Sequence, residues 1–175
     1  MDTQNILTAS EEALRLMTVS KNNPENNRLD IEISSSDLID ATRKILAADT
    51  DFYLSAITGL DLNPAPAPAE QTGATDQAEA AVNNLEVLYH FCSGAAVLTL
   101  RVKVALTNPV IPSVCTVIPS ASLYEREVME LFGIHFTGTP DTSRLLLSDD
   151  WPQGVYPLRK SFTGLPSPST EVKGS

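Results

Sequence analysis

Three glutamates, Glu125, Glu127 and Glu130, lie in one charged segment and are the residues most capable of chemistry. Paired carboxylates serve as general acid and general base in glycoside hydrolysis. On a helix, however, these three side chains point in different directions around the axis and do not converge on one substrate. Glu130 can instead pair with Arg126, four residues before it. Because no His, Ser or Lys nucleophile accompanies the glutamates, we predict that the chain has no catalytic residue.

Glu127 is the most informative of the three because of its place on the helix. On a helical wheel of residues 123–132, Glu127 falls between Leu123 and Leu131, at the edge of the apolar face. A carboxylate there is partly desolvated and needs a positive partner or several hydrogen-bond donors. We predict that Glu127 pairs with an arginine, either within this chain or across an interface. The alternative is a rim residue that reaches water. The cations downstream are Arg144, Arg159 and Lys160.

Composition and charge exclude several other functions. At 175 residues the chain is long enough for one domain, with or without tails. Its net charge of −10 argues against nucleic acid as a partner, because phosphate binding needs clustered Lys and Arg. Cys92 and Cys115 are too few and too far apart for a zinc or iron–sulfur site, and His90 and His135 have no ligand-like neighbours. We therefore predict no metal site and no cofactor site in this chain.

We expect neither a membrane-spanning segment nor a signal peptide. The best apolar run, residues 95–106, is broken by Arg101 and Lys103 and falls short of the roughly 20 residues that a spanning helix needs. The N-terminus shows neither the basic nor the apolar region of a signal peptide. These features predict a protein that stays in the cytoplasm, where partners can still hold it at a membrane.

The apolar periodicity predicts an α+β fold. We expect an antiparallel sheet of about four strands packed with two helices, followed by an irregular extended C-terminal arm. A further, short helix is expected to begin near residues 8–10, where the sequence resembles a helix start. The expected strands are residues 29–33, 52–60, 85–92 and 95–105, and the expected main helices are residues 38–46 and 123–132.

The same patterns divide the chain into four regions. Residues 1–27 are expected to form a short N-terminal helix and a linker. Residues 28–133 form the α+β domain, in which the Ala- and Pro-rich segment 63–84 is a mobile loop. Residues 134–162 form an extended partner-binding arm, and residues 163–175 a disordered tail.

The arm carries more apolar surface than a free tail should, with Trp151, Tyr156, Phe162 and the leucines 145–147. A segment of this length without helix or strand is unusual inside a compact domain unless it has a function. It either folds back on its own domain or lies on a partner. The residues to which we assign a structural or partner-binding role are Glu125, Arg126, Glu127, Glu130, Phe132, Gly133, Arg144, Trp151, Pro157, Leu158, Arg159 and Lys160.

The order of these motifs is specific. The helix sequence YEREVMELFGI is followed by GTPD, a leucine run and then DDWPQGVYPLRKSF. This combination resembles the 30-kDa subunit family of respiratory complex I, the C-type subunits of NADH:quinone oxidoreductase. The same family occurs in energy-converting, membrane-bound nickel–iron hydrogenases, and the resemblance does not separate the two kinds of complex. It covers roughly residues 52–162.

The resemblance implies a subunit without cofactor or catalytic residue, held by partner subunits at the cytoplasmic face of the cell membrane. It implies docking on a hydrogenase-like large subunit, which the C-terminal segment wraps around, beside a small iron–sulfur subunit. Antiporter-like membrane subunits are partners only indirectly. Iron–sulfur clusters are then expected in the partner subunits, and the assembly couples electron transfer to ion translocation. An alternative of another class is a stand-alone protein-binding module, outside any redox complex, whose arm folds back.

Overall fold

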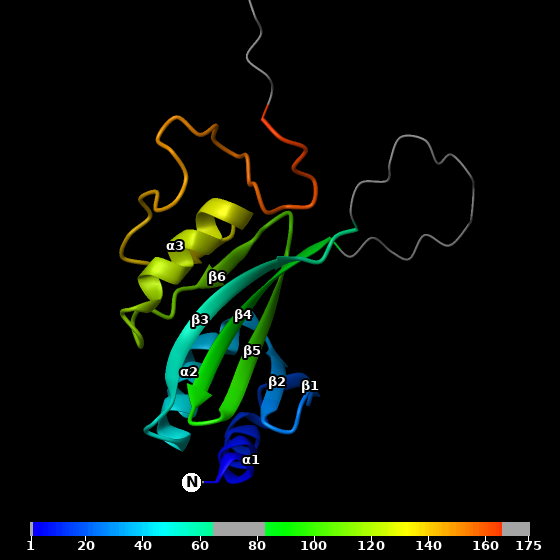
Figure 1. Cartoon of the computed structure of the whole chain (residues 1–175), viewed down its shortest axis with the longest axis vertical. Helices are drawn as coiled ribbons and strands as arrows, with labels where there is room; N and C mark the ends of the chain where they lie inside the picture. Colours follow the sequence, from blue (N-terminus) through cyan, green and yellow to red (C-terminus); the bar gives the residue numbers. More distant parts are fainter. Residues whose placement is uncertain (1, 65–82, 166–175) are drawn as a thin grey trace, which may run out of the picture.

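The computed structural model describes residues 2–64 and 83–165, which form one sheet with helices and an arm (Figure 1). In chain order, the elements are α1 (Thr3–Leu14), β1 (Thr18–Asn22), β2 (Arg28–Ile33), the 3-10 turn η1 (Ser35–Asp37), α2 (Leu38–Ala48), β3 (Tyr53–Asp61), β4 (Asn84–Ser93), β5 (Ala96–Ala105), β6 (Val110–Pro112), α3 (Ala121–Phe132) and β7 (His135–Thr137).

Five strands form the main sheet in the order β1-β2-β5-β4-β3. All neighbours are antiparallel except β2 and β5, which run parallel. The β4–β5 hairpin turns at Gly94, whose φ of 55° lies in the left-handed region that glycine adopts without strain. The two short strands β6 and β7 pair in parallel and bring the start of the arm beside the exit from the sheet.

The alternation along the strands decides which face of the sheet is buried. In β5, Leu98, Leu100 and Val102 are fully buried, whereas Lys103 on the other face is exposed. That second face carries ion pairs, with Arg101 on Glu86 at 2.8 Å and Lys103 on Glu32 at 3.0 Å. The helices therefore pack on the first face and close the core there.

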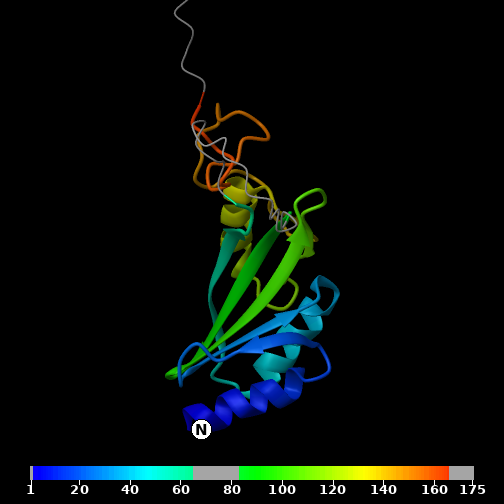
Figure 2. The same cartoon turned by 90° about the vertical axis from the view of Figure 1, so that its right-hand side faces the viewer.

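The arm and α1 lie at opposite ends of the molecule (Figure 1, Figure 2). At the α1 end, α2 buries Leu38, Ala41 and Ile45 into the core. At the other end, α3 packs against β3 and carries the arm on its outer side. The core and the arm are thus connected through α3.

The α+β class and the irregular arm are confirmed, but several elements differ from the prediction. The sheet has five strands, not four, because residues of the expected linker form β1. The first helix begins at Thr3, not near residues 8–10, and Ser10 lies inside it with its hydroxyl donating to the Ile6 carbonyl. The stretch around residues 8–10 resembled a helix start because serine and threonine hydroxyls bind backbone groups both at caps and inside helices.

The four-region division of the chain stays a prediction. Residues 65–82 of the expected loop and 166–175 of the expected tail lie outside the described residues. Within the part that is described, no helix is long and apolar enough to cross a membrane.

One close approach sets the distance between α3 and the sheet. Gly59 of β3 faces the ring of Phe132 from the last turn of α3, and a Cβ placed on Gly59 would lie 2.5 Å from the Phe132 Cδ2 atom. Only glycine permits this spacing, because a real Cβ needs more room than that.

Gly59→Ala is expected to lower the free energy of unfolding by about 1–3 kcal/mol, because the methyl group overpacks the Phe132 ring. Urea unfolding of the full chain measures this loss. Ser55→Ala, on the same strand but exposed, should change stability by less than about 0.5 kcal/mol. In a Phe132→Leu background the Gly59→Ala penalty should shrink. Equal stability of Gly59→Ala and wild type would show that the contact is not tight.

Candidate partner-binding site

A buried carboxylate holds α3 in place from its inner side. Glu125 is completely buried among α3 residues that face the core, such as Ala121 and Val128. Its carboxylate accepts hydrogen bonds from the Ser113 hydroxyl at 2.8 Å, the Val114 N–H at 2.8 Å and the Cys115 thiol at 3.3 Å. No Lys, Arg or His nitrogen of the described residues lies within 4 Å of it. Three donors of one loop satisfy the charge that a cation would otherwise balance.

The buried carboxylate affects two neighbouring groups. Burial raises the pKa of the Tyr89 hydroxyl well above its usual value, and the negative charge of Glu125 raises it further. Burial likewise raises the pKa of the Cys115 thiol, with the Glu125 charge acting in the same direction. Both groups therefore stay protonated at neutral pH, and the Cys115 thiol keeps the hydrogen that it donates to Glu125.

Glu127, not Glu125, was the glutamate predicted to be desolvated and to need a partner. The fully buried glutamate is Glu125, whereas Glu127 is half-buried. Among residues 2–64 and 83–165, Glu127 has no salt bridge and no side-chain hydrogen bond, so its pairing across an interface stays a prediction. The helix is rotated so that Glu125 points into the core. The helical wheel of residues 123–132 takes account of the helix residues alone. It therefore could not show that polar donors of residues 113–115 line part of the core.

Arg126 and Glu130 on the outer side of α3 hold the first half of the arm. Arg126 donates to the Ser143 carbonyl at 2.9 Å and the Arg144 carbonyl at 2.8 Å, and it pairs with Asp141 at 3.1 Å. The two Glu130 oxygens accept the N–H groups of residues 145 and 146 at 2.8 and 2.7 Å. The prediction of an Arg126–Glu130 pair is therefore wrong, because both side chains form their hydrogen bonds with the arm.

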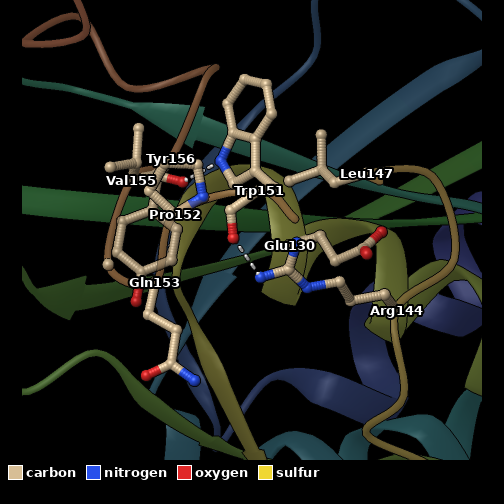
Figure 3. A pocket seen from close by; sticks show the side chains of 9 residues that line it. Glu130, Arg144, Leu147, Trp151, Pro152, Gln153, Val155 and Tyr156 are labelled. Atoms are coloured by element: carbon tan, nitrogen blue, oxygen red, sulfur yellow. Dashed lines mark hydrogen bonds between the residues drawn. The ribbon is translucent and has the colours of Figure 1, made fainter. Parts of the chain in front are cut away.

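The middle of the arm closes on itself around a hollow of about 380 Å³ (Figure 3). Arg144 donates to the carbonyls of Ser148 and Trp151, the latter at 2.6 Å, and the Trp151 indole N–H donates to the Val155 carbonyl at 2.8 Å. The Trp151 ring also lies 6.1 Å from the Phe162 ring, centroid to centroid. Arg144 thus shapes the arm through carbonyl groups, and Glu130, Leu147 and Tyr156 complete the lining of the hollow.

The end of the arm is fastened where α3 ends. Gly133 ends the helix in the left-handed region, at φ 69°, and the Tyr156 ring lies directly against it. Arg159 donates to the Phe132 carbonyl at 2.7 Å and lies over the Tyr156 ring at 4.3 Å from its centroid. A side chain on residue 133 would therefore meet both backbone strain and the Tyr156 ring.

A second anchor joins the arm to the sheet. The Lys160 N–H donates to an Asp61 carboxylate oxygen at 2.8 Å, and the Lys160 ammonium donates to the Asn63 carbonyl at 2.6 Å. Burial opposes ionisation of Asp61, but the N–H groups of Asn63 and Lys160 outweigh it, so the pKa of Asp61 lies below its usual value. Asp61 was not among the predicted residues. In the sequence, Asp61 lies at the end of a predicted strand and is followed by Asn63 and Pro64. This pattern predicts a turn, but it does not predict a contact with the arm.

The predicted residues thus fall into two groups. Nine of them make the contacts that hold the arm to α3, to β3 or to itself, while Glu125 points into the core and Glu127 contacts none of the described arm residues through a salt bridge or side-chain hydrogen bond. Among the described residues, Pro157 makes no polar contact, and its ring is half-buried in the arm. The nine are Arg126, Glu130, Phe132, Gly133, Arg144, Trp151, Leu158, Arg159 and Lys160.

The family of the chain follows from this stretch together with the sheet. The family model described as "Respiratory-chain NADH dehydrogenase, 30 Kd subunit" matches residues 31–167, which include the second half of β2, the sheet strands β3, β4 and β5, α3 and the arm. The chain belongs to this family. The resemblance noted in the sequence is therefore confirmed.

Relatives within the 30-kDa subunit family come from both kinds of complex. The chain is 37% identical over 93 residues to the membrane-bound hydrogenase subunit beta of Pyrococcus furiosus, and the match covers 53% of each chain. It is 43% identical over 89 residues to the C/D subunit of the NADH-quinone oxidoreductase of Methylococcus capsulatus, covering 50% of this chain and 14% of that one. The chain therefore spans about half, or much less, of the length of these relatives.

A solved structure shows the same fold. It is that of the membrane-bound sulfane sulfur reductase, described as an archaeal respiratory membrane complex, and one of its chains matches with a TM-score of 0.68 at 22% identity. The match covers 93% of this chain and 86% of that chain. At this identity the likeness establishes a shared fold and nothing about function.

Glu125→Ala is expected to lower the free energy of unfolding by roughly 2–4 kcal/mol, because it leaves the Ser113 hydroxyl and the Val114 N–H buried without an acceptor. Glu127→Ala, two residues along the same helix, should change it by less than about 0.5 kcal/mol. Chemical unfolding of the two full-length variants measures both values. A similar loss for the two would contradict the assignment of Glu125 as the buried anchor.

The Asp61 anchor predicts a pH dependence of the arm. Because its folded pKa is depressed, the contribution of Asp61 is complete above the pKa of an unfolded aspartate, about 3.9. This contribution to stability is lost as the pH falls through the lower pKa that Asp61 has in the folded protein. Hydrogen exchange of the Lys160 amide, corrected for intrinsic rates, should show protection that falls on acidification in this range. Asp61→Asn should be less protected at neutral pH and should lose this step; the same profile in both proteins would disprove the anchor.

Proposed function

We propose that this chain is a non-catalytic subunit of a membrane-bound redox complex, of the complex I type or of the related energy-converting hydrogenase type. In this role it docks on the hydrogenase-like large subunit and supports electron transfer coupled to ion translocation. The observation that carries the proposal is the arm, which follows α3 closely and still presents leucine side chains to solvent.

The arm is attached through its backbone, which leaves its side chains available. The N–H groups of Leu145 and Leu146 are bound by Glu130, and the N–H of Leu158 donates to the Leu131 carbonyl at 3.1 Å. The side chains of these arm leucines are 39%, 58% and 52% exposed, in chain order. Since apolar patches on a soluble surface usually mark an interaction site, a partner that covers them accounts for their exposure.

The names of the relatives support a large subunit as this partner. The Methylococcus capsulatus relative is named as a C/D subunit, and the matching segment is 14% of that chain. Its name indicates that a C-type part and a D-type part belong to one polypeptide. A covalent connection keeps the two parts close together, which favours packing between them. The D-type part corresponds in this proposal to the large subunit on which the arm docks.

The remaining parts of the proposal concern place and cofactors. We propose that the chain holds no cofactor and that the iron–sulfur clusters of the complex lie in the large subunit's neighbours, the small iron–sulfur subunit first among them. The complex then holds the chain at the cytoplasmic face of the membrane, and antiporter-like membrane subunits are reached only through other subunits. The name of the Pyrococcus furiosus relative, a subunit of a membrane-bound hydrogenase, supports the location at a membrane.

A stand-alone binding module is the second candidate, and one observation favours it. The arm already folds back on its own domain, with anchors at Arg126, Glu130, Arg159 and Asp61. In that case the purified monomer would be complete, and its leucines would need no subunit to cover them. Purification from native membranes separates the two candidates.

Arg159→Ala is expected to reduce recovery of the large subunit severalfold when the tagged chain is purified from its own membranes in mild detergent. The reason is that Arg159 fastens the end of the arm to the Phe132 carbonyl and the Tyr156 ring. Quantitative mass spectrometry of the bound proteins measures the recovery.

Arg43→Ala is the matched control, because Arg43 is an exposed arginine on α2 that pairs only with Asp40. It should leave recovery unchanged. Recovery of the wild-type chain without any other subunit would contradict the proposed function. Unchanged recovery with Arg159→Ala would contradict the role of the arm.

A further inference from the structure

The outer side of α3 carries an apolar strip with a carboxylate at its centre. Leu123, Glu127 and Leu131 follow one another at intervals of four residues and therefore share one side of the helix. Leu123 is 56% exposed although it is large and apolar, and Leu131 is partly buried. The strip flanks the side that buries Glu125 and Phe132, and Leu131 packs against the core at its edge.

The arm adds further exposed leucines that are attached to α3 through their backbone N–H groups. Leu145 and Leu146 bind Glu130, which is the neighbour of Glu127 at a spacing of three residues. Leu158 is bonded to the Leu131 carbonyl at the end of the helix. We call the exposed or partly exposed leucines of α3 and the arm, Leu123, Leu131, Leu145, Leu146 and Leu158, the leucine patch; Glu127 shares the α3 side of Leu123 and Leu131.

Within the described part of the chain, Glu127 is the charged side chain of α3 that has no partner. Glu125 has three donors, Glu130 binds two backbone N–H groups, and Arg126 pairs with Asp141. Across residues 2–64 and 83–165, Glu127 has neither a salt bridge nor a side-chain hydrogen bond. An apolar surface placed over it would remove its water and supply no compensating group.

We propose that the leucine patch docks against an apolar surface of the large subunit that presents one arginine or lysine to Glu127. This inference rests on the proposed function and names the chemistry of the contact. The cation compensates for the desolvation of the carboxylate and sets the register of the two surfaces, while the leucines supply buried apolar area.

Other occupants fit the patch less well. A two-fold contact between two copies centred on the patch would bring Glu127 towards its own symmetry mate, which is a repulsive pairing. The nearby arginines could not relieve it, because Arg126 and Arg144 are engaged by Asp141 and by arm carbonyls. A membrane surface rich in anionic lipid would repel both Glu127 and a chain of net charge −10.

The test compares Glu127→Gln and Glu127→Lys in the full-length tagged chain, purified from its own membranes. Loss of the charge in Glu127→Gln should lower recovery of the large subunit severalfold. Its reversal in Glu127→Lys should lower recovery by at least about tenfold, since a like charge then faces the partner's cation. Glu12→Lys is the control, because Glu12 carries the same charge on an exposed position of α1, at the other end of the molecule; its recovery should match wild type.

The facing cation is identified independently of recovery. Carbodiimide cross-linking of the purified wild-type complex should join Glu127 to a lysine of the large subunit if the cation is a lysine. Whether it is lysine or arginine, replacing it with glutamate should restore recovery of Glu127→Lys.

Each outcome decides between the two proposals. If wild type brings no large subunit, the proposed function fails. If wild type brings it and a correctly folded Glu127→Lys brings as much, only the docking inference is overturned; the fluorescence of Trp151, the single tryptophan, reports that fold. If Glu127→Lys changes only self-association measured by light scattering, the occupant is a second copy and the inference is likewise overturned.

Discussion

The arrangement of this protein depends on the buried Glu125 carboxylate. A charge inside a core is costly unless donors satisfy it, and here the donors come from one short loop, residues 113–115. Any rotation of α3 about its axis would break these bonds and leave the charge buried. The loop and the helix therefore fix each other. The Gly59–Phe132 contact then sets how closely the helix approaches the sheet.

The rotation of α3 decides how the arm can be held. With Glu125 turned inward, Arg126 and Glu130 point outward and bind carbonyl and N–H groups of residues 143–146. The arm needs these contacts because it has no regular ladder to satisfy its own backbone. Backbone attachment also leaves the side chains free, so the arm is positioned by polar bonds and presents apolar groups. A segment buried in the core would instead be positioned by its apolar side chains and would present none of them to solvent.

Local sequence patterns were enough to predict much of the fold. The alternation of Leu98, Leu100 and Val102 with charged residues marked the buried face of β5, and Gly94 and Gly133 marked a hairpin and a helix end. These signals are local because they reflect strand and helix periods and the conformational freedom of glycine. The irregular arm was predicted for the same reason: its sequence follows neither period. The extra strand β1, polar and at the sheet edge, gave no such signal, and neither did the three-residue strands β6 and β7.

The sequence by itself therefore determined the class of fold, the presence of an irregular arm and the family. Tertiary structure alone decided which glutamate is buried, because the three candidates are alike in sequence and differ only in what faces them. It also decided that Lys160 binds Asp61, 99 residues away along the chain. The physical reason is the same in both cases. A charged side chain takes its role from the donors and cations that folding brings within about 3 Å, and such distances depend on long-range packing that no local pattern encodes.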